Sequence, residues 1–570
     1  MSSLYNYSRR ISQVVNIGNI GIGGVNPIRI QSMTNTPTLD TLATVEQCMR
    51  TFDKGADIMR ITTPGIRDAE NLSNIKKELQ KAGYYQPLVA DVHFNPKVAE
   101  VAARIVSKVR INPGNYVDSK KFEQVEYTEK EYKLELERIH ERILPLLKIC
   151  KEHGTAIRVG VNHGSLSDRI ISKYGDTPQG MVESAMEFLK IFEAENFTQS
   201  VISMKSSNTR VMVYSTRLLV NTMLQAGMNY PVHLGVTEAG EGEDGIIKSA
   251  VGIGTLLTDG IGETIRVSLT GDPEQEIPVA QKIVNHYFEK LNHHPIKSDS
   301  ELKINQFDYQ RRKSKMIGKI GGTLSPKVCV LLDGNNEMGQ ITTIFSPDDI
   351  VIDKDTLMNV FSGTAEFAEK SLKDESLILS SDHINFAGDV RRMIGTISRY
   401  NIDLPIIFHR KYQETELYSL QIKAACDFGP LLIDGYADGI WLENEGNSIC
   451  STDMYLLSLN LLQASRLRMS KTEYISCPSC GRTLFDLSST TAKIRERTSH
   501  LKHLKIGIMG CIVNGPGEMA DADYGYVGSG VNKITLYKNK NVVKRNISED
   551  LAVDELIALI KECGDWKDKV

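Results

Sequence analysis

The sequence has little cysteine, few aromatic residues and no long apolar run, and each shortage excludes a class of protein. Its 9 cysteines among 570 residues are too few and too scattered for a disulfide-stabilised fold. No apolar run reaches about 18 residues, so we expect no membrane-spanning helix. Only 7% of the residues are aromatic, but 41% are hydrophobic, which is enough to form packed cores and excludes a wholly disordered chain.

Neither sign of charge dominates the sequence. The 67 Lys and Arg residues against 71 Asp and Glu residues give a net charge of −4, so no global positive field exists to attract nucleic acid. The first dozen residues lack the apolar segment of a secretory signal, and we expect a cytoplasmic protein. The length predicts about three to four ordinary domains, or fewer if one is a large barrel.

The first half of the chain alternates short apolar runs with stretches of helical spacing. Continuous β-branched runs are typical of strands buried on both faces of a parallel sheet. Eight such units predict an N-terminal TIM (β/α)8 barrel over residues 1–291, preceded by a Gly- and Asn-rich hairpin at 17–27. The eight predicted strands are residues 28–31, 57–61, 87–92, 108–111, 156–161, 201–204, 232–236 and 264–269.

Two further domains follow the predicted barrel. A polar, Pro-containing linker at 292–303 precedes a second β/α series that starts near residue 327. We predict an inserted α/β, barrel-like domain over 292–460, and we expect it to be a structural spacer because it shows no group of reactive side chains. Alternating strand and helix patterns over 461–570 predict a small C-terminal α/β domain that carries a close pair of cysteines.

Cationic side chains gather at the predicted C-terminal strand ends, where TIM barrels have their active sites. Five of the eight strands deliver an Arg or Lys to this ring. Such cations repel one another unless an anion compensates, and Arg suits phosphate oxygens, so the pattern predicts a small, multiply anionic ligand. The alternative is that each Arg pairs with a carboxylate, for which only Asp91 and Glu238 occupy equivalent positions. The five cations are Arg60, Arg110, Arg158, Lys205 and Arg266.

Other polar residues share these strand ends. Glu238 is a candidate proton donor or base, because a carboxyl group in a closed site can have its proton affinity tuned. His93 and His233 are open between ligand, acid–base group and buried structural residue, and the last is favoured for His233. The same strand ends carry Gln31, Ser32, Asn112, Asn162 and Ser268.

The cysteine motif of the C-terminal domain is the strongest local signal. It reads C-x2-C-x30-C-x6-E, from Cys477, Cys480, Cys511 and Glu518. A C-x-x-C turn presents two thiolates to one metal or cluster, and the glycines around Cys511 allow close approach to a bulky inorganic group. Three thiolates are expected when a [4Fe–4S] cluster leaves one iron to a more weakly bound oxygen ligand such as that of Glu518.

Alternative interpretations of the cysteines differ in the metal. A zinc ribbon would add His500 and His503, but its spacing is unusual and it leaves the Cys511 segment unexplained. Such a ribbon would suit a non-catalytic scaffold protein. A thioredoxin-like dithiol and a purely electron-transferring cluster on another barrel enzyme are further alternatives. The remaining cysteines, predicted to be small buried hydrophobic residues, are Cys48, Cys150, Cys329, Cys426, Cys450 and Cys563.

Several sequence blocks resemble the 4-hydroxy-3-methylbut-2-enyl diphosphate synthase family of the non-mevalonate isoprenoid pathway. They include GADIMRIT (55–62), VRINPGN (109–115), CPSCGRTLFD (477–486) and GCIVNGPGE (510–518). The resemblance spans nearly the whole chain apart from the insert, which looks like the extra domain of the long form found in plants and some bacteria. Without a transit peptide, the bacterial setting is favoured.

The resemblance implies an iron–sulfur oxidoreductase that opens the ring of 2-C-methyl-D-erythritol 2,4-cyclodiphosphate and removes a hydroxyl group. It implies a [4Fe–4S] cofactor, flavodoxin or ferredoxin as electron donor, and Glu238 as the acidic residue facing the reacting carbons. In the short form the cluster domain caps a partner's barrel, so a homodimer and the source of the cap stay open here.

The implied site residues form two groups. The cluster ligands would be Cys477, Cys480, Cys511 and Glu518. The implied substrate ligands are Arg60, Arg110, Arg158, Asn162, Lys205, Arg266 and Ser268, and from their strand-end positions we add His93 and Asn112.

Overall fold

The computed structural model of the chain divides into two compact units. The first, here the barrel unit, comprises Arg10–Gly245, Gly262–Gln281 and Lys471–Val570, and the second, the insert unit, comprises Met1–Arg9, Ile246–Ile261 and Lys282–Ser470. The predicted domain bounds 1–291, 292–460 and 461–570 stay predictions. The structure describes residues 4–118, 127–298, 302, 305–331, 349–352, 360–361, 376–446, 448–478, 480–512, 515–519 and 521–569.

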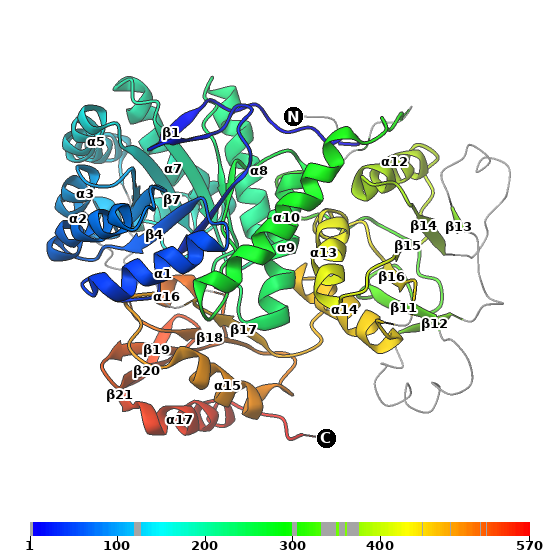
Figure 1. Cartoon of the computed structure of the whole chain (residues 1–570). Coiled ribbons are helices and arrows are strands. Elements are labelled where there is room, and N and C mark those ends of the chain that lie inside the picture. Colours follow the sequence, from blue (N-terminus) through cyan, green and yellow to red (C-terminus); the bar gives the residue numbers. More distant parts are fainter. Residues whose placement is uncertain are drawn as a thin grey trace. The chain divides into compact units, whose positions relative to one another are not determined.

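The predicted TIM barrel is confirmed. Its eight strands are all parallel and pair in the order β8-β7-β6-β5-β4-β3-β10-β9 (Figure 1). A bridge between Ile202 and Val232 closes the ring between β8 and β9. The strands are β3 (Arg29–Met33), β4 (Ile58–Thr62), β5 (Leu88–Asp91), β6 (Lys108–Ile111), β7 (Ala156–Asn162), β8 (Ser200–Lys205), β9 (His233–Leu234) and β10 (Thr264–Ile265).

A hairpin closes the bottom of the barrel. Strands β1 (Val15–Ile17) and β2 (Ile20–Ile22) pair antiparallel, slightly earlier in the chain than the predicted 17–27. Val15, Ile17 and Ile22 are fully buried in one cluster with side chains from the starts of the barrel strands, such as Ile58 and Ala156. This apolar plug leaves the opposite, C-terminal end of the barrel to polar side chains.

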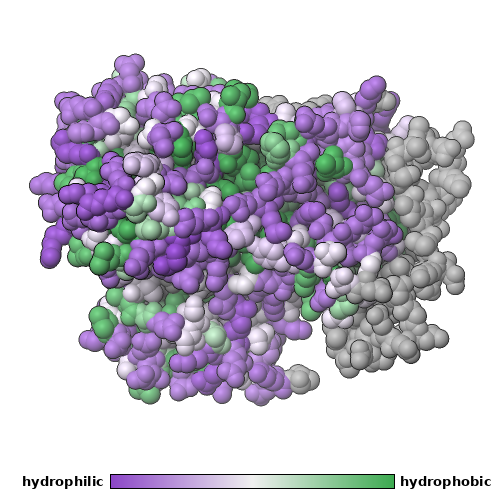
Figure 2. All heavy atoms as spheres, viewed as in Figure 1, coloured by the Kyte–Doolittle hydropathy of each residue, from purple (hydrophilic) through white to green (hydrophobic). Residues whose placement is uncertain are grey.

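The helices between the strands bury one face and expose the other. In α1, Val45, Cys48 and Phe52 are buried whereas Leu42 is exposed, and Asp40 caps the first turn by accepting from the Ala43 N–H. On the face shown in Figure 2, hydrophilic side chains predominate and hydrophobic ones are scattered. The helices are α1 (Thr41–Asp53), α2 (Ile66–Lys81), α3 (Pro96–Ala103), α4 (Pro113–Tyr116), α5 (Glu129–His153), α6 (Asp168–Tyr174), α7 (Pro178–Ala194), α8 (Thr209–Gln225), α9 (Gly242–Thr258), η1 (Pro273–Gln275), α10 (Glu276–Glu289) and η2 (Lys290–Asn292).

The insert forms a second parallel sheet, as predicted. Its strand order is β12-β11-β16-β15-β14-β13, and within the described ranges its two edge strands do not pair with each other. Across β14–β16, Ser380, His409 and Glu443 form a hydrogen-bonded chain. The elements are β11 (Lys327–Leu331), β12 (Ile350–Ile352), β13 (Val360–Phe361), β14 (Leu377–Ser380), α12 (Phe386–Arg399), β15 (Ile406–Tyr412), α13 (Leu417–Ile433), β16 (Gly439–Asn444) and α14 (Ser451–Ala464).

The C-terminal domain is a five-stranded mixed sheet, in agreement with the predicted small α/β domain. Strands β17, β18 and β19 are parallel, and β19, β20 and β21 continue as an antiparallel meander. No described helix of the chain is both long and apolar enough to cross a membrane. The elements are β17 (Glu473–Ser476), α15 (Leu487–Thr498), β18 (Lys505–Met509), α16 (Gly515–Glu518), β19 (Tyr524–Gly530), β20 (Lys533–Lys538), β21 (Asn541–Ser548) and α17 (Glu549–Glu562).

Candidate active site

One cavity of the barrel unit brings together the two predicted groups of site residues. It has a volume of about 710 Å³, part of it open to solvent. Its walls carry side chains from the barrel mouth and from the cysteine loops of the C-terminal domain. Both groups of side chains lie at or just after the C-terminal ends of parallel strands. The predicted residues that line it are Arg60, His93, Arg110, Arg158, Asn162, Lys205, Glu238, Arg266, Ser268, Cys477, Cys480 and Cys511.

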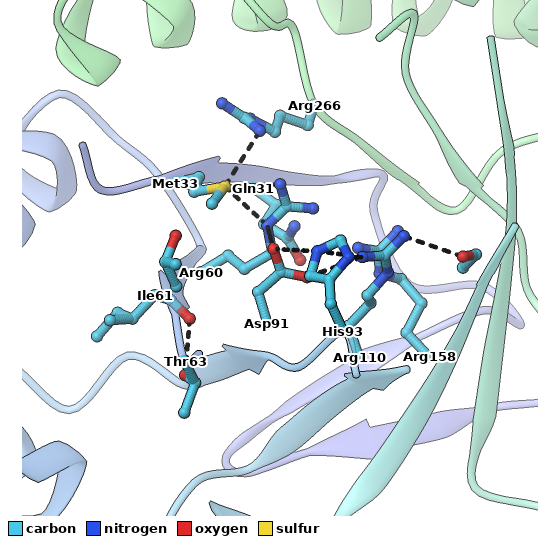
Figure 3. A network of polar contacts seen from close by, with 12 residues as sticks. Gln31, Met33, Arg60, Ile61, Thr63, Asp91, His93, Arg110, Arg158 and Arg266 are labelled. Atoms are coloured by element: carbon cyan, nitrogen blue, oxygen red, sulfur yellow. Dashed lines mark hydrogen bonds and ion pairs between the residues drawn. The ribbon is translucent and has the colours of Figure 1, made fainter. Parts of the chain in front are cut away.

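Asp91 is the carboxylate around which the barrel arginines are arranged (Figure 3). Arg110 Nη1 donates to its Oδ1 over 3.2 Å, and Arg60 Nε lies 4.0 Å from its Oδ2. Burial alone would raise the pKa of Asp91, but the guanidinium groups of Arg60 and Arg110 hold it well below its usual value. Asp91 is therefore ionised and partly compensates the positive mouth.

His93 is neutral, because of the hydrogen bond that it accepts. Arg110 Nη1 lies 2.7 Å from His93 Nε2, and a guanidinium can only donate, so Nε2 must carry the lone pair. Asp91 Oδ2 lies 3.2 Å from the same nitrogen, but without an N–H this nitrogen cannot donate a hydrogen bond to it. Burial lowers the pKa of His93 to about 3, Asp91 opposes this shift, and Arg110 adds to it. His93 consequently offers an uncharged ring to the cavity.

The cations of the mouth outnumber the carboxylates. Arg60, Arg110, Arg158, Lys205, Arg266 and Arg482 line the cavity, six cations against the two carboxylates of Asp91 and Glu238. Burial, and then repulsion from the neighbouring cations, lowers the pKa of Arg158 and of Lys205 well below their usual values. An anion bound in the cavity would favour the charged forms of both groups.

Arg158 has hydrogen-bonding capacity to spare. Its Nη1 donates to Ser203 Oγ over 2.7 Å, whereas Nε and Nη2 are buried without a hydrogen-bond partner among the described residues. Leaving charged donors unsatisfied in a buried site is costly. These two donors therefore fit an anionic ligand and support the predicted role of Arg158.

Arg266 corrects one part of the prediction from the sequence. Its Nη2 and Nε lie 3.0 and 3.3 Å from the two carboxylate oxygens of Glu276, a bidentate ion pair. The expectation that only Asp91 and Glu238 could neutralise the arginines was wrong, because Glu276 reaches the mouth from helix α10. Glu276 also accepts from Ser32 Oγ over 2.6 Å, so it holds Arg266 in a fixed position beside the cavity.

Of the predicted site residues Glu238 and Asn112, only Glu238 lines the cavity. Glu238 is buried, lines the cavity and has a positive φ of 47°, a left-handed conformation that non-glycine residues adopt mainly at turns and functional sites. Asn112 does not line the cavity: its side chain accepts from the Gly114 N–H and donates to Ser165 Oγ. It shapes the turn after β6, and direct contact with substrate stays a prediction.

The three predicted cysteines face the cavity from two loops. Cys477 follows β17, and Cys511 follows the neighbouring parallel strand β18. The Gly510 N–H lies 3.3 Å from Cys477 Sγ, and the Cys480 N–H donates to Thr483 Oγ1 over 3.1 Å, so backbone contacts order both loops. The side chain of Glu518 lies outside the described residues.

The other cysteines and the alternative zinc ligands lie elsewhere. Burial raises the pKa of Cys48, Cys150 and Cys426 to about 12, as expected for inert hydrophobic residues, and Cys329 is buried too. Cys450 and Cys563 are exposed, so the prediction that all six are buried was wrong for these two. His500 and His503 bond to the carbonyl oxygens of Lys567 and Asp565, and neither lines the cavity.

Residues missed by the prediction also line the cavity. Arg482 and Thr483 come from the loop after Cys480, and Met33 comes from the end of β3. Arg482 was visible in the sequence as a cation two residues beyond the motif. Its place beside the barrel arginines depends on how the C-terminal domain packs, and no local spacing reveals that packing.

Fold and site together define a (β/α)8-barrel enzyme with a cation-lined mouth covered by a cysteine-bearing α/β domain. Residues 12–281 match the GcpE TIM-barrel domain, and residues 473–562 match the GcpE protein C-terminal domain. The chain belongs to the GcpE family, whose curated relatives are named 4-hydroxy-3-methylbut-2-en-1-yl diphosphate synthase (flavodoxin).

The relatives match over the whole chain, including the insert between the two family domains. The one from Parabacteroides distasonis is 51% identical over 99% of this chain and 99% of its own, and the one from Porphyromonas gingivalis is 46% identical over 100% of both. Among solved structures, the N-acetylneuraminic acid synthetase of Leptospira borgpetersenii is 13% identical, with a TM-score of 0.34 over 51% of this chain and 94% of that one.

Proposed function

We propose that this chain uses a [4Fe–4S] cluster to convert 2-C-methyl-D-erythritol 2,4-cyclodiphosphate into 4-hydroxy-3-methylbut-2-enyl diphosphate. The observation that carries the proposal is one cavity whose wall combines five cations from the barrel with Arg482 and three cysteines from the C-terminal domain. A diphosphate fits the cations, and a reduction needs a redox centre close to the reacting carbons. The reaction consumes two electrons, breaks the ring C–O bond and releases the hydroxyl group as water.

The cysteine arrangement fits a cluster better than a single ion. No three His, Cys, Asp or Glu side chains in the described ranges converge on one metal ion, although three cysteines share the cavity wall. A zinc ion with bonds of about 2.3 Å to sulfur requires such convergence, whereas a cluster accepts more widely spaced thiolates. Cys477, Cys480 and Cys511 would hold the cluster, with Glu518 as the fourth ligand, and the cluster would supply electrons one at a time.

The residues of the barrel perform the binding and proton steps. Arg60, Arg110, Arg158, Lys205 and Arg266 hold the phosphate oxygens, with Asn162, Ser268, Asn112 and neutral His93 as further polar contacts. Glu238, buried in the same wall, delivers a proton to the departing hydroxyl oxygen. Asp91 keeps the arginine side chains oriented.

Flavodoxin is the electron donor that we favour, because the curated relatives carry it in their names, with ferredoxin as the alternative. Cluster thiolates need a reducing compartment, and we therefore assign the protein to the cytoplasm.

Metal analysis tests the cofactor. Protein purified without oxygen is expected to contain iron and sulfide and to absorb visible light, and Cys511→Ser is expected to abolish turnover. Cys450→Ser, a matched change at an exposed cysteine outside the cavity, is expected to leave both iron and turnover unchanged. Stoichiometric zinc without iron after anaerobic reconstitution would contradict the proposal.

Substrate affinity tests the cationic mouth. Arg60→Ala removes one charged partner of the diphosphate and is expected to weaken binding by about 10- to 100-fold, with an unchanged visible spectrum. The control is Arg50→Ala, which removes an exposed arginine paired with Glu274 outside the cavity. Calorimetric titration with the cyclodiphosphate measures both, and equal affinities of the two variants would rule out the proposed role.

A further inference from the structure

The loops that carry the cysteines rest directly on the barrel. A Cβ atom on Gly481 would lie 2.6 Å from the Thr36 carbonyl oxygen, and one on Gly517 would lie 2.7 Å from the Gly164 carbonyl oxygen. Real Cβ atoms do not come this close to backbone, so only glycine fits at either position. The glycines around Cys511 were expected to allow close approach to an inorganic group, but Gly517 instead allows close approach to the barrel's own backbone, as Gly481 also does.

Arg482 continues from Gly481 into the ion network of the barrel. Its Nη2 donates to the carbonyl oxygen of Asp91 over 3.3 Å and lies 3.9 Å from Asp91 Oδ2. The side chain is only 9% exposed and lines the cavity. Asp91 is thus contacted by two arginines from the barrel and by one from the C-terminal domain.

The charge balance shows that Arg482 does more than neutralise a carboxylate. Arg110 already donates to Asp91, and Arg60 lies within ion-pair distance. A third arginine adds a surplus cation to a wall that faces the proposed diphosphate. A guanidinium in this place both fastens the loop that carries Cys480 to the mouth and presents positive charge to the ligand.

We propose that Arg482 is a positioning residue of the reaction, which holds the Cys477–Cys480 loop over the barrel mouth through Asp91 and completes the cationic wall around the substrate. This inference rests on the proposed function. It assigns to a residue of the cysteine domain a task otherwise performed by barrel residues, and it adds a buried ionic contact to the glycine packing that joins the two domains.

A matched pair of variants tests the proposal. Arg482→Gln removes the charge inside the cavity, and Arg495→Gln removes an arginine on α15 that contacts Glu241 and Asp244 of the barrel unit but does not line the cavity. Arg482→Gln is expected to lower kcat on the order of 100-fold, because small misplacement of reacting groups has effects of this size. Arg495→Gln is expected to stay within about threefold of the wild type, because Arg495 lies outside the cavity and its ion pairs are partly open to solvent. Arg482→Lys is expected to restore part of the loss.

Two readouts separate positioning from a general loss of structure. Iron content and visible spectrum of Arg482→Gln are expected to equal those of the wild type, while amide hydrogen exchange over residues 477–486 rises in this variant and not in Arg495→Gln. Turnover of Arg482→Gln like that of Arg495→Gln would overturn the proposal, and so would a loss of iron that matches the loss of turnover. Absence of iron from the wild type would instead overturn the proposed function.

Coupling through Asp91 is tested by combining variants. If Arg482 acts through Asp91, Asp91→Asn together with Arg482→Gln lowers kcat by roughly the larger of the two single losses, because one interaction is removed once. A double loss equal to the product of the single losses would show that the residues act independently and would overturn the route through Asp91. If Asp91→Asn does not fold, the difference in kcat between Arg482→Gln and Arg482→Lys still tests whether the positive charge at position 482 is needed.

Discussion

Asp91 is the residue on which the electrostatics of the mouth depend most. It is 2% exposed, and its low pKa arises because Arg60 and Arg110 outweigh the opposing effect of burial. Removing one partner of a buried ion pair leaves the other charges uncompensated, at a cost larger than the pair itself contributes. A change at Asp91 therefore tests stability and ligand binding together.

Asp91→Asn is expected to lower the free energy of unfolding by about 3 kcal/mol. Inorganic pyrophosphate is expected to restore part of it, since an anion that binds only the folded state stabilises that state. Thermal unfolding with and without pyrophosphate measures both effects. Glu135→Gln, which breaks a surface pair with Arg138, should cost less than about 1 kcal/mol, and pyrophosphate should stabilise it only as much as it stabilises the wild type, because its mouth is unchanged. Equal behaviour of the two variants would contradict this account.

His93 gives the protein a defined response to acid. Its pKa is lowered to about 3 in the folded state, so between about pH 6.5 and pH 3 the unfolded chain binds a proton that the folded chain does not. Stability from this residue is therefore fully present above about pH 6.5 and falls by about 1.4 kcal/mol for each pH unit below it. His93→Gln is expected to flatten this dependence, as measured by urea unfolding at several pH values. Parallel pH profiles of variant and wild type would refute the assignment.

The sequence predicted the site residues on the barrel strands better than those that reach the mouth from helices or from the C-terminal domain. Parallel strand ends meet at one edge, so Arg60, Arg110 and Arg158 could be grouped from strand positions alone. Glu276 and Arg482 could not, because one reaches the mouth from a helix and the other from a separate domain. Asn112 has the right strand position, but its side chain serves the turn that follows.

Among the elements, helices α10 and α13 share a buried ionic cluster within the insert unit. Asp427 of α13 is fully buried and contacts His286 and Lys290 at 2.9 and 3.1 Å and Arg410 at 3.3 Å. Burial alone would raise the pKa of Asp427, but these cations hold it far below its usual value. The insert is thus joined by charge as well as by apolar packing to the segment 282–292 that precedes it.

Asp427→Asn is expected to destabilise the insert unit by about 3 kcal/mol, because it leaves Lys290 and Arg410 buried without a counter-charge. Trp441, buried in β16, reports unfolding of this unit through its fluorescence in urea. The comparison is Glu445→Gln, which breaks the exposed pair with Lys411 and should change stability by less than about 1 kcal/mol. A shift no larger than that of Glu445→Gln would show that the cluster is dispensable.

The pattern of apolar residues predicted where the strands lie more accurately than it predicted how long they are. All eight barrel runs are strands, because continuous apolar segments suit a sheet covered on both faces. Each of the five apolar runs that predict strands in the insert also contains one; these runs are VCVLLDG (328–334), DIVID (349–353), SLILSSD (376–382), LPIIFH (404–409) and GIWLE (439–443). β9 and β10 have only two residues each, since the chain leaves the regular ladder where Glu238, Arg266 and Ser268 turn toward the cavity. β13 was not predicted.

For the whole molecule, the barrel strands and the C-terminal domain fall in one compact unit, although the insert separates them in sequence. Local patterns could place each domain along the chain, but not say which surfaces meet. Both halves of the proposed active site belong to the same chain, so the cap need not come from a partner.

A mixing experiment tests this arrangement. Arg60→Ala impairs the barrel half of the site and Cys511→Ser the cysteine half, and each chain keeps the other half intact. At a substrate concentration far below KM, where Arg60→Ala turns over about a tenth as fast as the wild type or less, an equimolar mixture is expected to show no more turnover than the sum of the separate variants, because each chain covers its own barrel. Recovery of about a quarter of wild-type activity would instead indicate exchange of domains between chains.

The surplus of arginines has a consequence for how this enzyme behaves in its surroundings. Six cations against three carboxylates, Asp91 and Glu238 in the cavity wall and Glu276 beside it, do not distinguish a cyclic diphosphate from any other small polyanion by charge alone. Inorganic phosphate and sulfate are therefore expected to compete for the mouth, and the apparent KM should rise with their concentration and with ionic strength. The flux through this enzyme would then depend on the phosphate status of the cell as well as on the supply of substrate and electrons.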